Sequence, residues 1–289
     1  MNPKLVHQTL HLDQPSWPDY QLLDSGDGAK LERLGLHTIV REEPMACHPR
    51  SLSGEKWDAA DTIYLDEKGW QPRPGTPETW TINFGPLTLM VRPAPGFKHI
   101  GIFPEQAPQW QWLLNQTLPD MATPPRLLNL FGHTGTATLA AAHTGFAITH
   151  IDSSKPALKQ ARENQKLSNL EDAPIRWIQE DVSKFVDREI KRGNCYDSIL
   201  LDPPVFGRGP KGQAWQIERD LPDLLLRLTK LLTEDFHFLF LNLYAGGLSA
   251  DSVKPLLQQH GNLQQGSFRL EAKNGPDLKM ADWLCLQKN

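Results

Sequence analysis

Hydrophobic positions in residues 101–289 follow two alternating patterns. Short apolar runs, typical of buried strands, are separated by segments in which apolar residues recur three or four positions apart, as on one face of a helix. Val182, Val186 and Ile190 share such a face. The expected strands cover residues 126–130, 147–151, 175–178, 196–201 and 236–241, and the expected helices cover residues 136–144, 156–167, 181–192, 221–232 and 249–259.

This alternation predicts a parallel sheet with helices on both faces. Two further β-type runs, 264–270 and 280–286, have no long helix between them and fit an antiparallel hairpin at the sheet edge. We therefore expect an α/β, Rossmann-like sheet of seven strands, mostly parallel. Such a sheet binds its ligand at the carboxyl ends of the strands, near the point where the strand order reverses.

The first hundred residues have a different texture. They are rich in Pro and Gly, and turn signals such as residues 25–28 separate short β-type runs. We predict a small, mainly β amino-terminal domain over residues 1–100, a candidate for substrate binding, and a catalytic domain over residues 101–289. The β-type runs of the first part are 20–23, 36–40, 62–65, 80–84 and 87–91.

Composition excludes several protein classes. The net charge is −4 and neither part is basic, which gives no support for strong, sequence-independent nucleic-acid binding, although local patches can bind phosphate on an acidic protein. Cys47, Cys195 and Cys285 stand far apart, without zinc-site spacing. No signal peptide or span of roughly 20 apolar residues is visible. We expect a cytoplasmic protein without a metal site or membrane contact, and its oligomeric state is left open.

A glycine-containing turn follows the first expected strand. In the run Asn129-Leu130-Phe131-Gly132-His133-Thr134-Gly135, two glycines let the backbone turn tightly and approach a ligand. No Lys-Ser/Thr pair follows, which excludes a phosphate loop, and the glycine spacing does not match the dinucleotide fingerprint. Adenosylmethionine, which has no phosphates, is the remaining nucleotide ligand. A plain strand-to-helix turn is the alternative.

Acidic residues follow the next expected strands. Asp152 at the end of the second strand can accept both ribose hydroxyls, as the acidic residue of dinucleotide folds does. Asp181 after the third can accept the adenine amino group, while Val182 packs on the ring. For each aspartate the alternative is a helix cap.

The fourth expected strand ends in Asp202-Pro203-Pro204. Asp202 and the Pro203 carbonyl could orient a nucleophile at the transferred methyl group, with help from Tyr244; the alternative is a rigid turn. A short basic cluster, which includes Arg208 and Lys211, lies beside this segment together with Trp215, and it could grip phosphate and stack a base. A solvated loop with one packed tryptophan is equally consistent with it.

Segments 128–135, 150–152 and 201–212 resemble the class I adenosylmethionine-dependent methyltransferases. More narrowly, they are similar to the bacterial branch related to 23S ribosomal RNA cytosine-5 methyltransferases, and segment 99–106 resembles the part that precedes its catalytic domain. The resemblance implies that the turn holds the methionine end and that Phe103 to Gln106 close over the cofactor. The expected cofactor-binding residues are Phe103, Glu105, Gln106, Asn129, Phe131, Gly132, His133, Thr134, Gly135, Asp152, Ser153, Asp181, Val182 and Asp202.

One departure bears on the reaction. Cytosine-5 enzymes attack the base with a cysteine, which in the relatives follows the fifth strand, whereas segment 241–247 here contains none. We therefore expect in-line transfer of the methyl group to RNA, ribosomal RNA in particular, without a covalent enzyme adduct. The alternatives are a protein or small-molecule methyltransferase, an inactive adenosylmethionine-binding module and a nicotinamide oxidoreductase.

Overall fold

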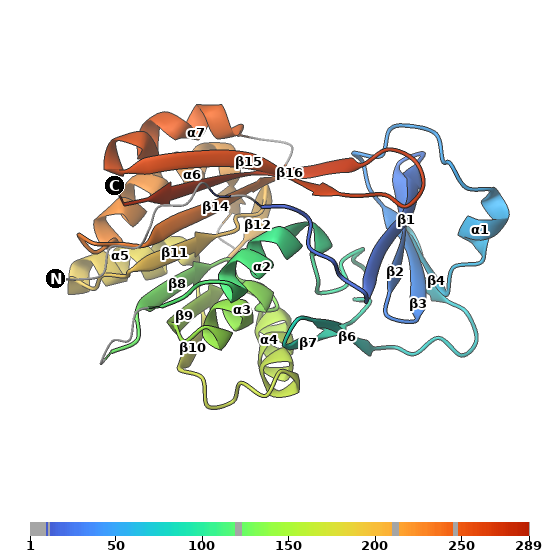
Figure 1. Ribbon diagram of the computed structural model, residues 1–289, viewed down its shortest axis with the longest axis horizontal. Helices are drawn as coiled ribbons and strands as arrows, with labels where there is room; N and C mark the ends of the chain where they lie inside the picture. Colours follow the sequence, from blue (N-terminus) through green and yellow to red (C-terminus); the bar gives the residue numbers. More distant parts are fainter. Residues whose placement is uncertain (1–9, 11, 119–122, 210–213, 245–247, 289) are drawn as a thin grey trace.

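The computed structural model describes residues 10, 12–118, 123–209, 214–244 and 248–288. A seven-stranded sheet with helices on both faces forms the larger part of the molecule, and a five-stranded sheet lies to one side of it (Figure 1). None of the helices in the described ranges is long and apolar enough to span a membrane.

The larger sheet has the expected Rossmann-like form. Its strand order is β10-β9-β8-β11-β14-β16-β15, so the order reverses between β8 and β11, and β16 runs in the direction opposite to the other six strands. The expected seven strands and the edge hairpin are therefore confirmed. The bounds are β8 Arg126–Leu130, β9 Ala147–Asp152, β10 Ile175–Gln179, β11 Ser198–Leu201, β14 Phe238–Tyr244, β15 Asn262–Leu270 and β16 Leu278–Gln287.

Two hydrophobic layers cover this sheet. Residues of α2 and α3 pack in one layer, with α4 beside α3, and α5, α6 and α7 pack in the other. Successive side chains of a strand point to opposite faces of the sheet, so Leu127 of β8 packs in the first layer and Leu128 packs in the second. The helices are α2 Ala107–Leu114, α3 Thr136–His143, α4 Lys155–Leu167, α5 Val182–Arg192, α6 Ile217–Leu228 and α7 Ala250–Leu257, with the short 3₁₀ helices η1 Pro104–Gln106, η2 Thr229–Leu231 and η3 Gln258–His260.

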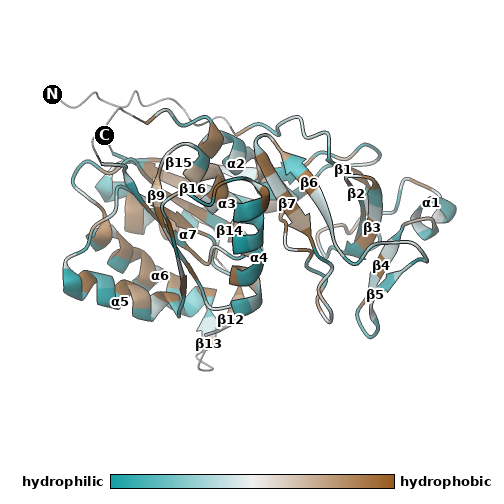
Figure 2. Ribbon diagram, turned by 90° about the horizontal axis from the view of Figure 1, so that it is seen from below, coloured by the Kyte–Doolittle hydropathy of each residue, from teal (hydrophilic) through white to brown (hydrophobic). Residues whose placement is uncertain are grey.

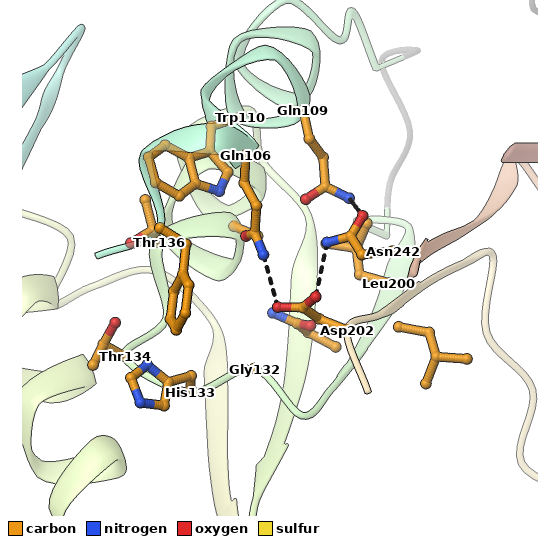
Figure 3. Close-up of a pocket in the computed structure, with 14 residues that line it drawn as sticks. Gln106, Gln109, Trp110, Gly132, His133, Thr134, Thr136, Leu200, Asp202 and Asn242 are labelled. Atoms are coloured by element: carbon orange, nitrogen blue, oxygen red, sulfur yellow. Dashed lines mark hydrogen bonds between the residues drawn. The ribbon is translucent and has the colours of Figure 1, made fainter. Parts of the chain in front are cut away.

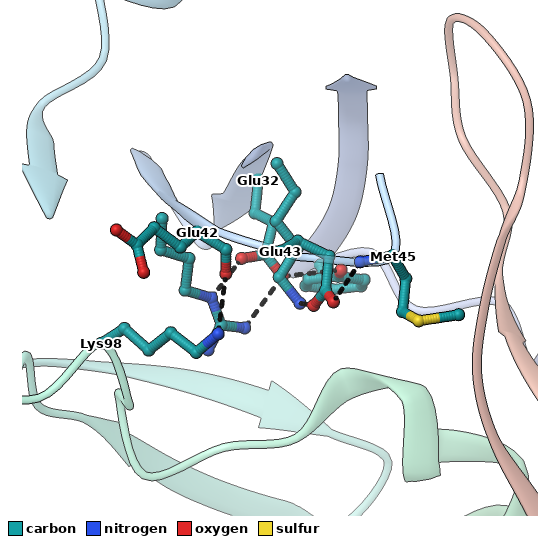
Figure 4. A network of polar contacts seen from close by, with 8 residues as sticks. Glu32, Glu42, Glu43, Met45 and Lys98 are labelled. Carbon is teal, nitrogen blue, oxygen red and sulfur yellow. Dashed lines mark hydrogen bonds and ion pairs between the residues drawn. The ribbon is translucent and has the colours of Figure 1, made fainter. Parts of the chain in front are cut away.

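The amino-terminal sheet contains two strands that the hydrophobic pattern did not reveal, β2 and β5. The pattern did not predict β2 because this strand buries charged side chains. Lys30 and Glu32 are almost inaccessible to solvent, and the Arg41 guanidinium donates to Glu32 at 2.6 Å within the network of Figure 4. The strand order is β1-β2-β3-β4-β5. The bounds are β1 Tyr20–Gly26, β2 Ala29–Leu34, β3 His37–Glu42, β4 Thr62–Leu65 and β5 Gly69–Pro72, with the helix α1 Gly54–Asp58.

A hairpin of β6 (Trp80–Phe84) and β7 (Leu87–Val91) packs against α4 of the larger part. The Met90 amide donates to Asn164 Oδ1 at 2.9 Å, and Gln160 Nε2 donates to the Met90 carbonyl at 2.8 Å. This hairpin therefore connects the amino-terminal hundred residues to the helix that follows β9.

The loop between β15 and β16 makes a second connection, which the sequence did not predict. It reaches from the large sheet to the edge of β1, as Figure 1 shows in red beside dark blue. The Lys273 amide donates to the Leu22 carbonyl at 2.9 Å, and Asn274 Nδ2 donates to the Leu23 carbonyl at 2.8 Å.

Candidate cofactor and methyl-transfer site

The turn between β8 and α3 is tightly constrained. Phe131 (φ 58°), His133 (φ 48°) and Gly135 (φ 83°) all have left-handed backbone conformations. Such a conformation in a non-glycine residue is uncommon and persists only where the surrounding structure enforces it, typically at a functional site.

The two glycines are required by packing against the protein itself. A Cβ on Gly132 would clash with the His150 ring, and a Cβ on Gly135 would lie 3.0 Å from the Trp177 ring. The structure thus gives them a packing role, and the close ligand approach that the sequence suggested stays a prediction. They let the turn lie directly on β9 and β10.

Asp152, at the end of β9, stabilises this turn through hydrogen bonds. Its Oδ2 accepts from the His133 amide at 2.8 Å and its Oδ1 accepts from the Ser154 amide at 2.7 Å. A carboxylate has about four acceptor positions, so capacity remains for the ribose hydroxyls that the sequence assigned to Asp152.

Asp181 caps a helix. Its Oδ1 accepts from the Lys184 amide at 3.0 Å at the start of α5, while Val182 packs into the layer below α5. Neither residue lines the cavity described next. Contact with adenine therefore stays a prediction for both, alongside the capping role that the structure demonstrates.

A small cavity lies between η1, α2 and the carboxyl ends of β8, β11 and β14 (Figure 3). Several expected cofactor residues line it, namely Phe103, Gln106, Asn129, Gly132, His133, Thr134 and Asp202. The sequence did not single out the other lining residues, which are Gln109, Trp110, Thr136, Ala137, Leu200, Leu201 and Asn242.

Asp202 is the centre of a hydrogen-bond network in this cavity (Figure 3). Its two carboxylate oxygens accept from Gln106 Nε2 at 2.8 Å and from Asn242 Nδ2 at 3.0 Å. Gln109 Nε2 donates to Asn242 Oδ1 at 3.3 Å, and Gln106 also donates to the Tyr244 hydroxyl oxygen at 2.7 Å. Burial raises the pKa of Asp202 to about 6, against the lowering effect of the two amide donors.

Tyr244 and Glu105 lie beside this network. Burial raises the pKa of Tyr244 well above its ordinary value, and the charges of Asp202 and Glu105 raise it further. Burial also raises the pKa of Glu105, although the charge of Lys30 opposes this. Tyr244 is therefore a neutral phenol whose hydroxyl group is positioned by Gln106.

Two buried polar atoms around the cavity lack a partner among the described residues. They are Trp110 Nε1 and His133 Nδ1. A buried polar atom without a hydrogen bond is costly, so these atoms indicate a polar ligand. The methionine end of S-adenosylmethionine carries a carboxylate and an ammonium group, and the cavity's donors and acceptors fit both. The sequence did not identify Trp110 as a site residue because it lies on α2, a short helix without a clear periodic pattern of apolar residues.

A small hairpin of β12 (Phe206–Arg208) and β13 (Ala214–Gln216) follows the Asp-Pro-Pro segment. Trp215 is anchored: its indole N–H donates to the Pro204 carbonyl at 2.7 Å, and its ring packs on Phe131 with centroids 4.9 Å apart. Phe206, in contrast, is 69% exposed. The Arg208 side chain and Lys211 lie outside the described residues, so their expected phosphate contact stays a prediction.

None of the three cysteines lines the cavity. Cys47 lies in the amino-terminal part, Cys195 precedes β11 at the opposite end of that strand, and Cys285 is buried in β16, where burial raises its pKa. Within the described ranges, no cluster of three or more His, Cys, Asp or Glu side chains could hold a metal ion.

The reversed strand order, the strained turn after β8 and the carboxylates at the ends of β9 and β11 define a class I methyltransferase fold and site. The structure is similar to the crystal structure of a SAM-dependent methyltransferase from Agrobacterium tumefaciens, with a TM-score of 0.88 and 35% identity over 99% of this chain and 95% of that one. The chain belongs to the S-adenosylmethionine-dependent methyltransferases, whose cofactor and methyl donor is S-adenosylmethionine.

Other similarities are more distant or partial. A putative SAM-dependent methyltransferase from Streptococcus mutans shares the fold, with a TM-score of 0.71 and 17% identity over 93% of this chain and 75% of that one. The chain is also 34% identical over 132 residues, 45% of its length, to ribosomal RNA large subunit methyltransferase K/L from Pseudoalteromonas translucida. It spans only 18% of that relative's length. No protein-family model matches the chain.

Proposed function

We propose that this protein methylates RNA, and ribosomal RNA in particular. The choice of RNA as the substrate rests on the similarity to ribosomal RNA large subunit methyltransferases. For the relative from Shewanella frigidimarina, this similarity covers 171 residues, or 58% of this chain. The proposal takes the cytoplasm, where ribosomal RNA occurs, as the protein's location.

The cofactor, when bound, supplies a methyl group that its sulfonium centre already activates. We assign its methionine end to the turn of residues 129–135 and to Trp110, its ribose to Asp152 and its adenine to Asp181 and Val182. The amino-terminal domain of residues 1–100 is assigned to the RNA substrate.

Asp202 is the proposed catalytic residue. Its half-buried carboxylate lines the cavity and accepts hydrogen bonds from Gln106 and Asn242. It can accept a hydrogen bond from an N–H or O–H nucleophile and take the departing proton, because a pKa of about 6 leaves it ionised at neutral pH and basic enough for this transfer. The carbonyl of Pro203 and the hydroxyl of Tyr244 assist orientation in this proposal.

The nucleophile in this mechanism belongs to the substrate. Since no cysteine lines the cavity, the arrangement supports direct transfer of the methyl group and not a covalent adduct with the base. The chain's own residues supply approach, orientation and a proton acceptor.

The test is transfer of a tritiated methyl group from S-adenosylmethionine to separate RNA, protein and metabolite fractions, taken from cells that lack this protein. We expect label in ribosomal RNA with wild-type protein and about 10²–10⁴ times slower labelling with Asp202→Asn. Label confined to the protein or metabolite fraction would contradict RNA as the substrate. S-adenosylhomocysteine binding without label in any fraction would instead indicate an inactive binding module.

A further inference from the structure

The outward face of α4 carries a stripe of positive charge. Lys155, Lys159, Arg162 and Lys166 are four, three and four positions apart, which places them on one side of the helix, and all four are exposed. They line a hollow on the protein surface together with Gln179 at the end of β10. Figure 2 shows α4 as hydrophilic along its outward side. We call these four residues the α4 stripe.

The stripe is poorly neutralised. Glu163 is the only carboxylate among the residues that line the hollow, and it pairs at 2.8 Å with Arg92, which directly follows β7. Lys159 Nζ lies 3.9 Å from the same carboxylate and is 75% exposed, so this contact is weak. A concentrated positive surface therefore stands on a chain whose net charge is −4.

The stripe is also fixed relative to the cofactor turn. On the inner side of α4, Asn164 Nδ2 donates to the carbonyl of Thr134, a residue that lines the cavity, at 3.0 Å. Ser154 caps the helix, and Lys155 follows Asp152 by three residues. The stripe thus begins at the carboxyl edge of the sheet and runs about 16 Å along the helix.

We propose that the α4 stripe binds successive phosphates of the RNA substrate. This inference rests on the proposed function and adds a surface that extends from the cofactor turn. Exposed cations on a rigid element suit a phosphate backbone, since their binding releases counterions from the nucleic acid. A protein partner is less well matched, because none of the exposed large hydrophobic side chains in the described ranges lies on α4.

The test compares two triple variants with equal loss of charge. The first, Lys159→Gln/Arg162→Gln/Lys166→Gln, keeps good helix formers on α4 and leaves Lys155 beside the cofactor turn intact. The control, Lys191→Gln/Lys230→Gln/Lys254→Gln, changes α5, η2 and α7 on the opposite face of the sheet. The measurements are binding of purified ribosomal RNA over a series of salt concentrations, methyl transfer to that RNA and binding of S-adenosylhomocysteine.

We expect the α4 variant to bind RNA at least tenfold more weakly near 0.1 M salt. Its salt slope should fall by about two, because each lost phosphate contact removes about 0.7 from the slope for a single strand. S-adenosylhomocysteine binding and the control variant should match wild type. If wild-type protein binds and methylates RNA but the α4 variant shows an unchanged salt slope, the phosphate-binding role of the α4 stripe is wrong and the proposed function still stands. Wild-type protein that neither binds nor methylates RNA overturns the proposed function together with it.

Discussion

At the scale of single residues, Asp202 shows how desolvation and hydrogen bonding set the pKa and the orientation of a carboxylate. Two amide donors keep the carboxylate oriented, while the loss of water keeps its pKa near 6. Its pKa in the folded protein lies above the ordinary value of 3.8, so the carboxyl group stabilises the fold at low pH. That contribution is lost as the pH rises through about 6.

We therefore expect methyl transfer to increase with pH through about 6, as Asp202 becomes ionised. Asp202→Asn should lower kcat by about 10²–10⁴ and abolish this rise, because the proposed proton acceptor is removed. Its thermal midpoint at pH 8 should equal or exceed that of wild type, since a buried charge is lost. Measured pH–rate profiles and melting curves test both statements. A variant that retains the same pH dependence would exclude Asp202 as the titrating group.

Asp181 permits a second test that separates two roles. Its carboxylate caps α5, a role that serine also fills well, whereas the proposed contact with adenine uses the carboxylate. We expect Asp181→Ser to keep the free energy of unfolding within about 0.5 kcal/mol and to weaken S-adenosylhomocysteine binding measured by calorimetry. Asp181→Ala should lose both. Wild-type affinity in the serine variant would leave Asp181 with the cap alone.

Phe206 is a better candidate for base stacking than Trp215, whose ring and N–H are already engaged. We expect Phe206→Ala to weaken RNA binding by about 1–3 kcal/mol, as loss of one stacked base does, and to raise the KM for RNA more than it lowers kcat. Phe97→Ala is the matched control, because Phe97 is 65% exposed and Phe206 is 69% exposed. Equal effects of the two substitutions would argue against stacking at Phe206.

At the scale of elements, the strand-turn-helix unit from β8 to α3 combines strain with close packing. The turn passes so close to β9 and β10 that side chains are excluded at two positions, Gly132 and Gly135. Contact with β9 and β10 thus determines the shape of the turn, and the turn itself forms part of the cavity wall.

This packing predicts the effect of a single methyl group. Gly135→Ala must adopt φ near +83° and also push its Cβ against the partly buried Trp177 ring and the Cβ of Ala161. Gly75→Ala is the control, because Gly75 has φ +91° with nothing within 4 Å of the added atom. Both should lose about 1–2 kcal/mol of stability through the backbone conformation, and Gly135→Ala should lose more. Chemical denaturation measures the difference, and equal losses would contradict the packing argument.

At the scale of the whole molecule, buried charges link neighbouring strands of the amino-terminal sheet. Figure 4 shows the network around Glu32 and Glu43, with Lys98 close by. Burial raises the pKa of Glu32, but the charges of Arg41 and Lys30 outweigh this and hold it at about 2. The carboxylate therefore stabilises the fold above pH 4.5, and this contribution is lost as the pH falls towards 2.

Acid unfolding tests this network. A shift from 4.5 to about 2 corresponds to about 3 kcal/mol of stability between those pH values. We expect Glu32→Gln to be less stable by about 3–5 kcal/mol at pH 7, because Arg41 is left buried without its partner. The stability of this variant should also depend less on pH below 4.5. If the stability of the variant depends on pH below 4.5 as strongly as that of the wild type, other carboxylates determine the acid unfolding.

Local patterns in the chain determined most of the large sheet and several residues of the site. Strand and helix periods depend on near neighbours, and the ends of parallel strands meet at one edge, so the convergence of Asn129 and Asp202 followed from sequence alone. The hydrophobic pattern did not reveal strand β2, because the buried carboxylate of Glu32 is stabilised by Arg41 of the neighbouring strand β3.

Only the tertiary structure decided which side chains complete the cavity. Trp110 comes from a helix without a clear period, and Asn242 is identified by its hydrogen bond to Asp202 from 40 positions away. The contact of Asn274 with β1 spans 251 positions. Such contacts depend on packing between distant segments, which no local period encodes, whereas the order of strands, helices and their terminal acids is encoded locally.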